Sequence, residues 1–193
     1  MKSLKNYIQE KLIIKKSNYK YFPKTKKELK DIILQRIKAE GNEVDLNDID
    51  VSEITDMSEL FEGTDFNGDI SGWDVSNVTD MHSMFFKCSK FNQDISEWDV
   101  SNVTDMSYMF AWCKDFNQDI SGWDVLKVTN MSRMFFWCEN FNQDISSWDV
   151  LKVTDMSRMF FGCENFNQDI SSWDVSSVKY FIDIFYNCKK KEI

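Results

Sequence analysis

A period of 25 residues runs through most of this chain and limits the folds that it can adopt. Phenylalanine, tryptophan and cysteine each recur at this interval, at Phe66, Phe91, Phe116, Phe141 and Phe166, at Trp73, Trp98, Trp123, Trp148 and Trp173, and at Cys88, Cys113, Cys138, Cys163 and Cys188. A fixed interval of about 20–50 residues is typical of repeat proteins in which each unit buries its apolar side against the next. The sequence therefore predicts a solenoid, in which each repeat forms one coil of a stack.

The spacing of apolar residues within one repeat predicts a short strand followed by a single helical turn. In the second unit these residues are Ile70, Trp73, Val75, Val78, Met81, Met84, Phe85, Cys88 and Phe91. The opening, I-x-x-W-x-V, has the spacing of a leucine-rich-repeat strand, with Trp73 and Val75 inward and Asp74 outward. Residues 81–85 are expected to form one helical or 3₁₀ turn on the return path. The predicted class is an α+β repeat solenoid.

The chain divides into three segments. The repeats occupy residues 46–190 and make six coils, of which the first lacks the tryptophan and the cysteine and the last drifts in sequence. Terminal coils are expected to differ because each has only one neighbouring coil. We predict a six-coil solenoid over 46–190, a capping segment over 25–45, and a basic N-terminal helix and linker over 1–24.

The capping segment carries the signals of a helix start and a helix end. Thr25 and Glu28 fit a capping box, in which each side chain satisfies a free N–H of the first turn. Gly41 stands where a C-terminal glycine is expected. We predict a helix over 25–40 that shields the apolar end of the stack. Residues 3–12 are expected to form a shorter amphipathic helix, with its apolar stripe at Leu4, Tyr7, Ile8 and Leu12.

The charge distribution excludes some classes of partner. Residues 1–45 contain twelve Lys/Arg and six Asp/Glu, a net charge of +6, whereas residues 46–193 contain eleven and twenty-six, a net charge of −15. So acidic a repeat surface does not suit a phosphate backbone, and no nucleic-acid partner is expected. No apolar run approaches the roughly 18–20 residues of a membrane span. The N-terminus as written has neither a secretory signal core nor a cysteine for a lipid, which favours a cytoplasmic location.

The repeat units resemble a known family. The sequences DISGWDVSNVTDMHSMF, DISEWDVSNVTDMSYMF and DISSWDVLKVTDMSRMF are similar to the BspA-like repeat, a 25-residue relative of the leucine-rich repeat first noted as a mycoplasma repeat of unknown function. The resemblance covers about residues 42–190. It implies a right-handed parallel-coil solenoid and a binding or surface-adhesion role in bacteria, and hence the cell surface as an alternative location. It implies no catalytic residues.

The cysteine, aspartate and asparagine columns are expected to be structural. The cysteines favour buried thiols, with disulfides between coils or a metal as alternatives. The aspartate columns, which include Asp69, Asp94, Asp119, Asp144 and Asp169, favour hydrogen bonds from carboxylates to turn N–H groups, with calcium between coils as the alternative. The asparagine column, Asn67, Asn92, Asn117, Asn142 and Asn167, is expected to form an amide ladder that ties the loops together.

Nothing in the sequence indicates catalysis. The single histidine, His82, is expected to be exposed and has no repeated partner. The chain has no phosphate-binding glycine loop and no nucleophile at a strained turn. We predict that the protein is not an enzyme and that it has no cofactor and no resident metal.

The candidate binding residues are those that vary between repeats, because a solenoid keeps its core constant. They are Trp112, Leu126, Arg133, Trp137, Leu151 and Arg158, all in the middle coils. Tryptophan and arginine often anchor interfaces, although the two tryptophans could instead pack locally. The leading hypothesis is a non-enzymatic repeat protein that binds a protein or a glycan. The alternatives are an intracellular or virion-associated scaffold that self-assembles end to end through its C-terminal coil, and a calcium-stabilised binding domain.

Overall fold

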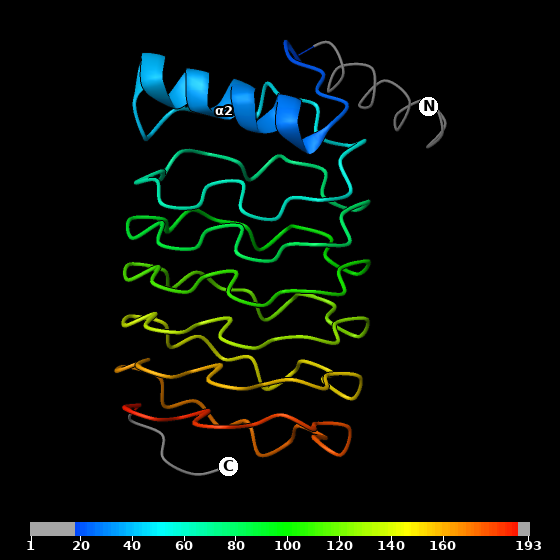
Figure 1. Ribbon diagram of the computed structural model, residues 1–193, viewed down its shortest axis with the longest axis vertical. Helices are drawn as coiled ribbons and strands as arrows, with labels where there is room; N and C mark the ends of the chain where they lie inside the picture. Colours follow the sequence, from blue (N-terminus) through cyan, green and yellow to red (C-terminus); the bar gives the residue numbers. More distant parts are fainter. Residues whose placement is uncertain (1–17, 189–193) are drawn as a thin grey trace, which may run out of the picture.

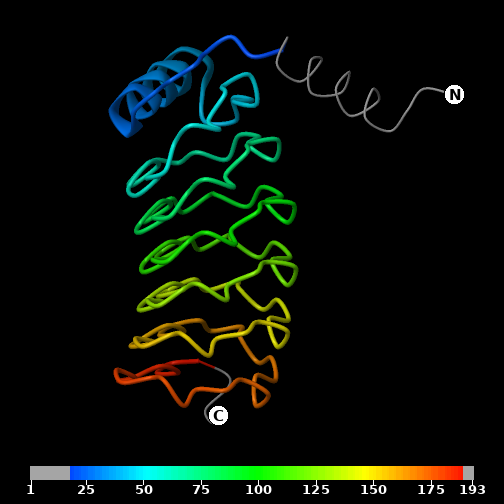
Figure 2. The ribbon, with the colours of Figure 1, turned by 90° about the vertical axis from the view of Figure 1, so that its right-hand side faces the viewer.

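The computed structural model describes residues 18–188, and the short helix predicted over residues 3–12 lies outside them. The described chain contains one helix, α2 (Lys26–Glu40), followed by a stack of flat coils. Figure 1 shows α2 across one end of the stack and the C-terminal coil at the other end. Figure 2 shows from the side that successive coils lie above one another along the long axis.

Helix α2 begins and ends at the capping residues found in the sequence. The hydroxyl of Thr25 accepts the N–H of Glu28 at 3.2 Å, and the N–H of Gly41, at φ +94°, donates to Ile37 O at 2.9 Å. The carboxylate of Glu28 accepts the N–H of Lys24 at 2.7 Å rather than that of Thr25, so the predicted reciprocal bond is displaced by one residue. The helix start is therefore fixed by two side-chain bonds.

One face of α2 packs on the first coil. Leu29 and Ile33 are fully buried there. Around them, basic side chains reach down to the coil: Lys30 Nζ donates to Glu59 O at 2.6 Å, and Arg36 pairs with Asp48 at 2.8 Å. Apolar burial and these polar contacts together hold α2 over the end of the stack.

Neighbouring coils are joined by the same four backbone hydrogen bonds at every junction. Between the second and third coils, N–H groups of Met81, Ser83, Phe85 and Lys87 donate at 2.8–3.0 Å to carbonyls of Asp105, Ser107, Met109 and Ala111. A succession of parallel bridges runs beside them, through Asp56, Asp80, Asp105, Asn130, Asp155 and Tyr180. Along this segment, each coil therefore presents N–H groups towards the C-terminal end of the stack and carbonyls towards the N-terminal end, whereas the bond at the threonine turn, as from Thr104 N–H to Thr79 O, runs the opposite way.

The local conformation differs from the prediction. Within the described coils, residues 70–75 form a turn at 71–72 followed by irregular chain rather than a strand, and residues 82–87 form successive turns rather than a helical turn. In the first segment the N–H of Trp73 closes a turn by donating to Ile70 O at 3.1 Å. In the second, the left-handed backbone at Ser83 (φ 54°) and Lys87 (φ 60°) interrupts the helix. The predicted side-chain directions are confirmed: Trp73 and Val75 are buried and Asp74 is exposed.

Stacked rings fill the core. Phe85, Phe110, Phe135 and Phe160 follow one another with ring centroids 5.6–5.8 Å apart. The tryptophan column lies alongside, and each indole N–H donates to the preceding coil, as Trp98 does to Ile70 O at 3.2 Å. The predicted buried thiols are confirmed: the cysteines form no disulfide, and burial raises the pKa of Cys88 to about 11.

Candidate functional site

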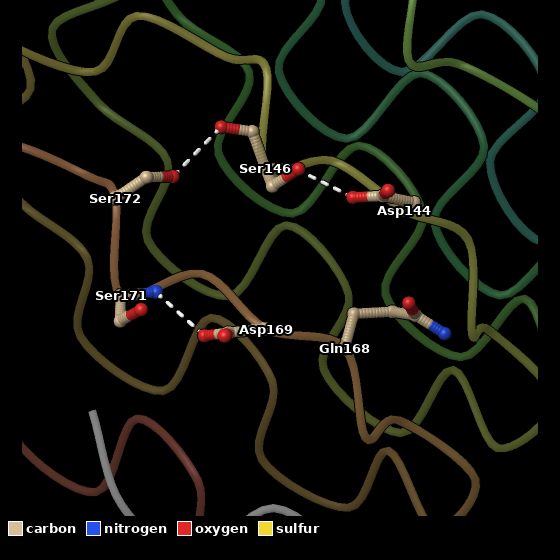
Figure 3. Close-up of a pocket in the computed structure, with 6 residues that line it drawn as sticks. All are labelled: Asp144, Ser146, Gln168, Asp169, Ser171 and Ser172. Carbon is tan, nitrogen blue, oxygen red and sulfur yellow. Dashed lines mark hydrogen bonds between the residues drawn. The ribbon is translucent and has the colours of Figure 1, made fainter.

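The first aspartate column holds turns, as predicted. In each repeat the carboxylate accepts the N–H of the serine two residues further on, as Asp119 does from Ser121 at 2.9 Å. Figure 3 shows two successive members of the column, Asp144 and Asp169. They lie beside a shallow hollow with a volume of about 320 Å³. The hollow is lined by Asp144, Ser146, Gln168, Asp169, Ser171 and Ser172. The hydroxyl of Ser172 crosses the junction to Ser146 O at 3.0 Å, so this polar surface is largely bonded to itself.

The calcium hypothesis lacks a site in the described part of the chain. Residues 18–188 contain no group of three or more His, Cys, Asp or Glu that could hold a metal ion. The asparagine ladder, by contrast, is confirmed: Asn67 Oδ1 accepts the N–H of Asn92 at 2.9 Å, and the next coils repeat this bond. Structural roles therefore account for both the asparagine column and the first aspartate column.

The turn bonds make the fold sensitive to acid. The backbone N–H of Ser121 is the main cause that holds the pKa of Asp119 below its ordinary value of 3.8. Because the folded pKa is the lower one, this stabilisation is complete above pH 3.8 and is lost as the pH falls through the folded pKa. The pKa is also below its ordinary value at seven other aspartates: Asp48, Asp56, Asp69, Asp94, Asp99, Asp144 and Asp174. We expect the melting temperature to fall steeply below about pH 4.

Replacement of Asp119 separates the hydrogen bond from the charge. Asp119→Ala is expected to cost about 0.5–1 kcal/mol, at the low end for a lost cap because the site faces solvent. Asp119→Asn should retain most of that stability, since Asn130 already accepts the N–H of Ser132 at 3.0 Å in the same way. Urea unfolding at pH 7 measures both variants. Equal losses for alanine and asparagine would contradict the turn-bond assignment.

The prediction that His82 is exposed is wrong, because its ring is half-buried between two coils. Its Nδ1 lies 2.8 Å from Ser107 Oγ and its Nε2 lies 3.1 Å from Ser83 Oγ. Since Ser107 Oγ donates to Asp105 at 2.5 Å, Nδ1 is the donor to Ser107. The signal in the sequence was Ser107, which stands one period after His82. Because Ser107 belongs to the coil after that of His82, this network, which includes the buried Ser83, joins two coils.

Two of the variable columns share one unusual property, which is a left-handed backbone. Tyr108, Trp112, Arg133, Trp137 and Arg158 have φ between 55° and 66°. Bulky residues rarely adopt this conformation, and Gly162 occupies the tryptophan column one coil later. We call these five residues the aromatic–arginine stripe. Sequence reasoning found their variability but not their backbone, although Gly63 and Gly162 in the same column were the available signal.

The stripe brings most of the predicted site residues together. The rings of Trp112 and Trp137 stack with centroids 5.4 Å apart at 14°, and both are half-buried. The guanidinium of Arg133 lies over the Tyr108 ring, 5.1 Å from its centroid. Arg158 pairs with Asp183 at 3.3 Å. Trp137 also covers Gly162, where an added Cβ would lie 2.7 Å from the indole.

The two predicted leucines lie at a different turn. Leu126 and Leu151 are exposed, and their N–H groups donate to Asp124 and Asp149 at 3.0–3.1 Å. The backbone N–H groups of Trp112 and Trp137 instead donate to carbonyls of the following coil. The six predicted residues therefore form two groups: the tryptophans and arginines within the stripe, and a separate pair of leucines.

Comparison with known proteins identifies a family but no individual relative. No curated protein and no solved structure matches the chain. Over residues 18–188, no helix is long and apolar enough to cross a membrane. A family model matches twice, over residues 29–135 and 116–192, which together include most of α2 and all the coils. The chain therefore belongs to the family described as "Mycoplasma protein of unknown function, DUF285".

Proposed function

We propose that the protein is a non-enzymatic binding module that recognises its ligand through the aromatic–arginine stripe. The stacked, half-exposed pair of Trp112 and Trp137 is the observation that supports this proposal most strongly. Five other tryptophans are buried, at 3–7% exposure, so this pair alone offers indole surface to a partner. Tryptophan and arginine carry much of the binding free energy in protein interfaces.

The backbone adds a second argument. A left-handed conformation at a bulky residue costs free energy and persists where the surrounding structure enforces it, often at functional sites. Here glycine would serve better for folding alone, as it does at Gly162. The neighbouring arginines favour a protein ligand with acidic groups, and a glycan that stacks on the indoles is the other outcome of the test. An adhesion-type role, as the BspA-like resemblance implies, is one form of this function, at the cell surface or in the cytoplasm.

A charge-matched pair of double variants tests the stripe. We expect Arg133→Glu with Arg158→Glu to weaken capture of the ligand by at least about tenfold, because two interface charges are reversed. Lys127→Glu with Lys152→Glu makes the same charge change in the same two coils, at the exposed turn beside the leucines. Ligands would be identified on a glycan array and by affinity capture, with the melting temperature as folding control. Equal binding by both double variants would refute the stripe as the binding site.

A second candidate function is that of a scaffold that assembles through its end. The observation that favours it is the C-terminal coil, where Tyr180, Phe181, Ile182 and Tyr186 are all 61–65% exposed. Exposed apolar patches of this kind mark interaction surfaces. Light scattering across a concentration series would reveal whether the chain associates with itself.

A further inference from the structure

The C-terminal coil exposes apolar columns that every other coil buries. Val175 and Phe181 are 37% and 65% exposed. The residues at the equivalent positions in the interior coils, such as Val150 and Met156, are at most 2% exposed. The difference arises because the described residues place no further coil on this side. The apolar surface is therefore of the kind that coil stacking normally covers.

The residues of this coil are also more apolar than its position requires. Tyr180 stands in the column of Asp80, Asp105, Asn130 and Asp155. Ile182 stands in the column of His82, Ser107, Ser132 and Ser157. A terminal repeat that faces water is expected to gain polar side chains on its outer face. These two replacements go in the opposite direction, which indicates that this face is covered by a partner.

The backbone defines the chemistry of that partner. At each interior junction, four N–H groups donate to carbonyls of the following coil. In the last coil the equivalent donors are the N–H groups of Phe181, Asp183, Phe185 and Asn187, and none of them has an acceptor within residues 18–188. A partner that matches this face therefore presents a row of carbonyl groups in the spacing of a coil edge.

A second copy of this chain does not meet that need. Two C-terminal faces brought together would set N–H groups against N–H groups. The complementary carbonyl edge of the chain belongs to its first coil, and α2 covers that edge (Figure 1). Lys26 of α2 lies at this edge, where its ammonium group donates to the side chains of Asp56 and Ser58. An end-to-end homodimer therefore leaves the donor row unsatisfied.

We propose that the C-terminal face binds a coil of the same repeat type from another chain, one whose carbonyl edge is not covered by a helix. The partner coil adds four hydrogen bonds and buries Val175, Phe181 and Ile182, as happens at the interior junctions. This inference rests on one part of the second candidate function, assembly through the C-terminal coil, and assigns that face to a different repeat chain rather than to a second copy of this one. It does not depend on the aromatic–arginine stripe.

The test uses the full chain and a synthetic peptide of residues 92–116, which is one complete coil containing the four acceptor carbonyls. Fluorescence anisotropy of the labelled peptide should show saturable binding. Amide hydrogen exchange should slow by at least about tenfold at Phe181, Asp183, Phe185 and Asn187 when the peptide is bound. In the peptide-free chain these amides should exchange rapidly, in contrast to the equivalent interior amides of Met156 and Phe160.

Two double variants complete the test. Phe181→Lys with Ile182→Lys should weaken peptide binding by at least about tenfold, because both exposed side chains would be buried by the partner. Leu126→Lys with Leu151→Lys adds the same charge at another turn and should leave binding unchanged. Three results would overturn the proposal: no saturable binding, protection that appears at other amides, or a dimer of the chain alone that protects the four amides. A failure of the stripe variants would not affect these readouts.

Discussion

Replacement of Phe135 by alanine is expected to lower the free energy of unfolding by about 3–5 kcal/mol. Phe135 is fully buried. The centroid of its ring lies 4.0 Å from the ring centroid of Phe141, 5.6 Å from that of Phe160 and 5.8 Å from that of Phe110. The cavity would lie between coils whose positions are fixed by four hydrogen bonds at each junction, so it cannot collapse easily. Urea unfolding monitored by circular dichroism would measure the loss.

The next residue provides the control. Phe136 has the same side chain but is only half-buried, on the outer side of the coil, where it stacks on Phe161 at 5.0 Å. Phe136→Ala removes the same atoms and should cost roughly 1 kcal/mol, the ordinary loss for a substitution outside the core. If the two alanine variants lost equal stability, the assignment of Phe135 to the central ring stack would be wrong.

The burial pattern could be predicted because a period of 25 residues repeats each environment. Once Phe91 is assigned to the core, Phe116 and Phe141 follow, and all three are fully buried. The same logic predicted the asparagine ladder and the turn bonds of the aspartates, since equal spacing places like groups in neighbouring coils. Periodicity therefore determines which residues meet, even where it leaves their conformation open.

The local conformation could not be predicted for the same reason that the stripe was incompletely described. The expected helical turn rested on apolar spacing, which does not report the sign of φ. Within residues 18–188, ten non-glycine residues adopt positive φ, and nearly all their side chains are types that seldom do. Gly63 and Gly162 marked one of the two affected columns. Glu59 and Ser83 in the other column gave no comparable signal.

The candidate site was only partly predictable because variability identifies surface positions without placing them on one surface. Trp112 and Trp137 share a column, so their stacking follows from the period. Leu126 lies eleven residues before Trp137 in the chain, at a different turn. The donor row of the C-terminal coil was not predictable, because residue types do not reveal in which direction the backbone N–H and carbonyl groups point across a junction.

The second large effect is expected at α2. Leu29→Ala and Ile33→Ala should each cost about 2–5 kcal/mol, because both side chains are fully buried between the helix and the first coil. Leu34→Ala is the matched control: Leu34 is 43% exposed on the same helix, so its loss should stay well under the losses of the other two. Thermal unfolding of the three variants measures the difference. Similar losses at all three sites would show that α2 is not docked through this face.

The same variants also test whether α2 prevents the first coil from binding another coil. If α2 leaves the first coil, the carbonyls of residues 56, 58, 60 and 62 become accessible, and these correspond to the acceptors that each later coil offers to its neighbour. The chain would then carry a carbonyl edge at one end and a donor row at the other. A heterologous contact of this kind does not close on itself, so it propagates. We therefore expect Leu29→Ala with Ile33→Ala to associate head to tail with increasing concentration, and Leu34→Ala not to. Light scattering would distinguish the two, and a double variant that stays monomeric while α2 exchanges rapidly would argue against coil docking at the C-terminal face.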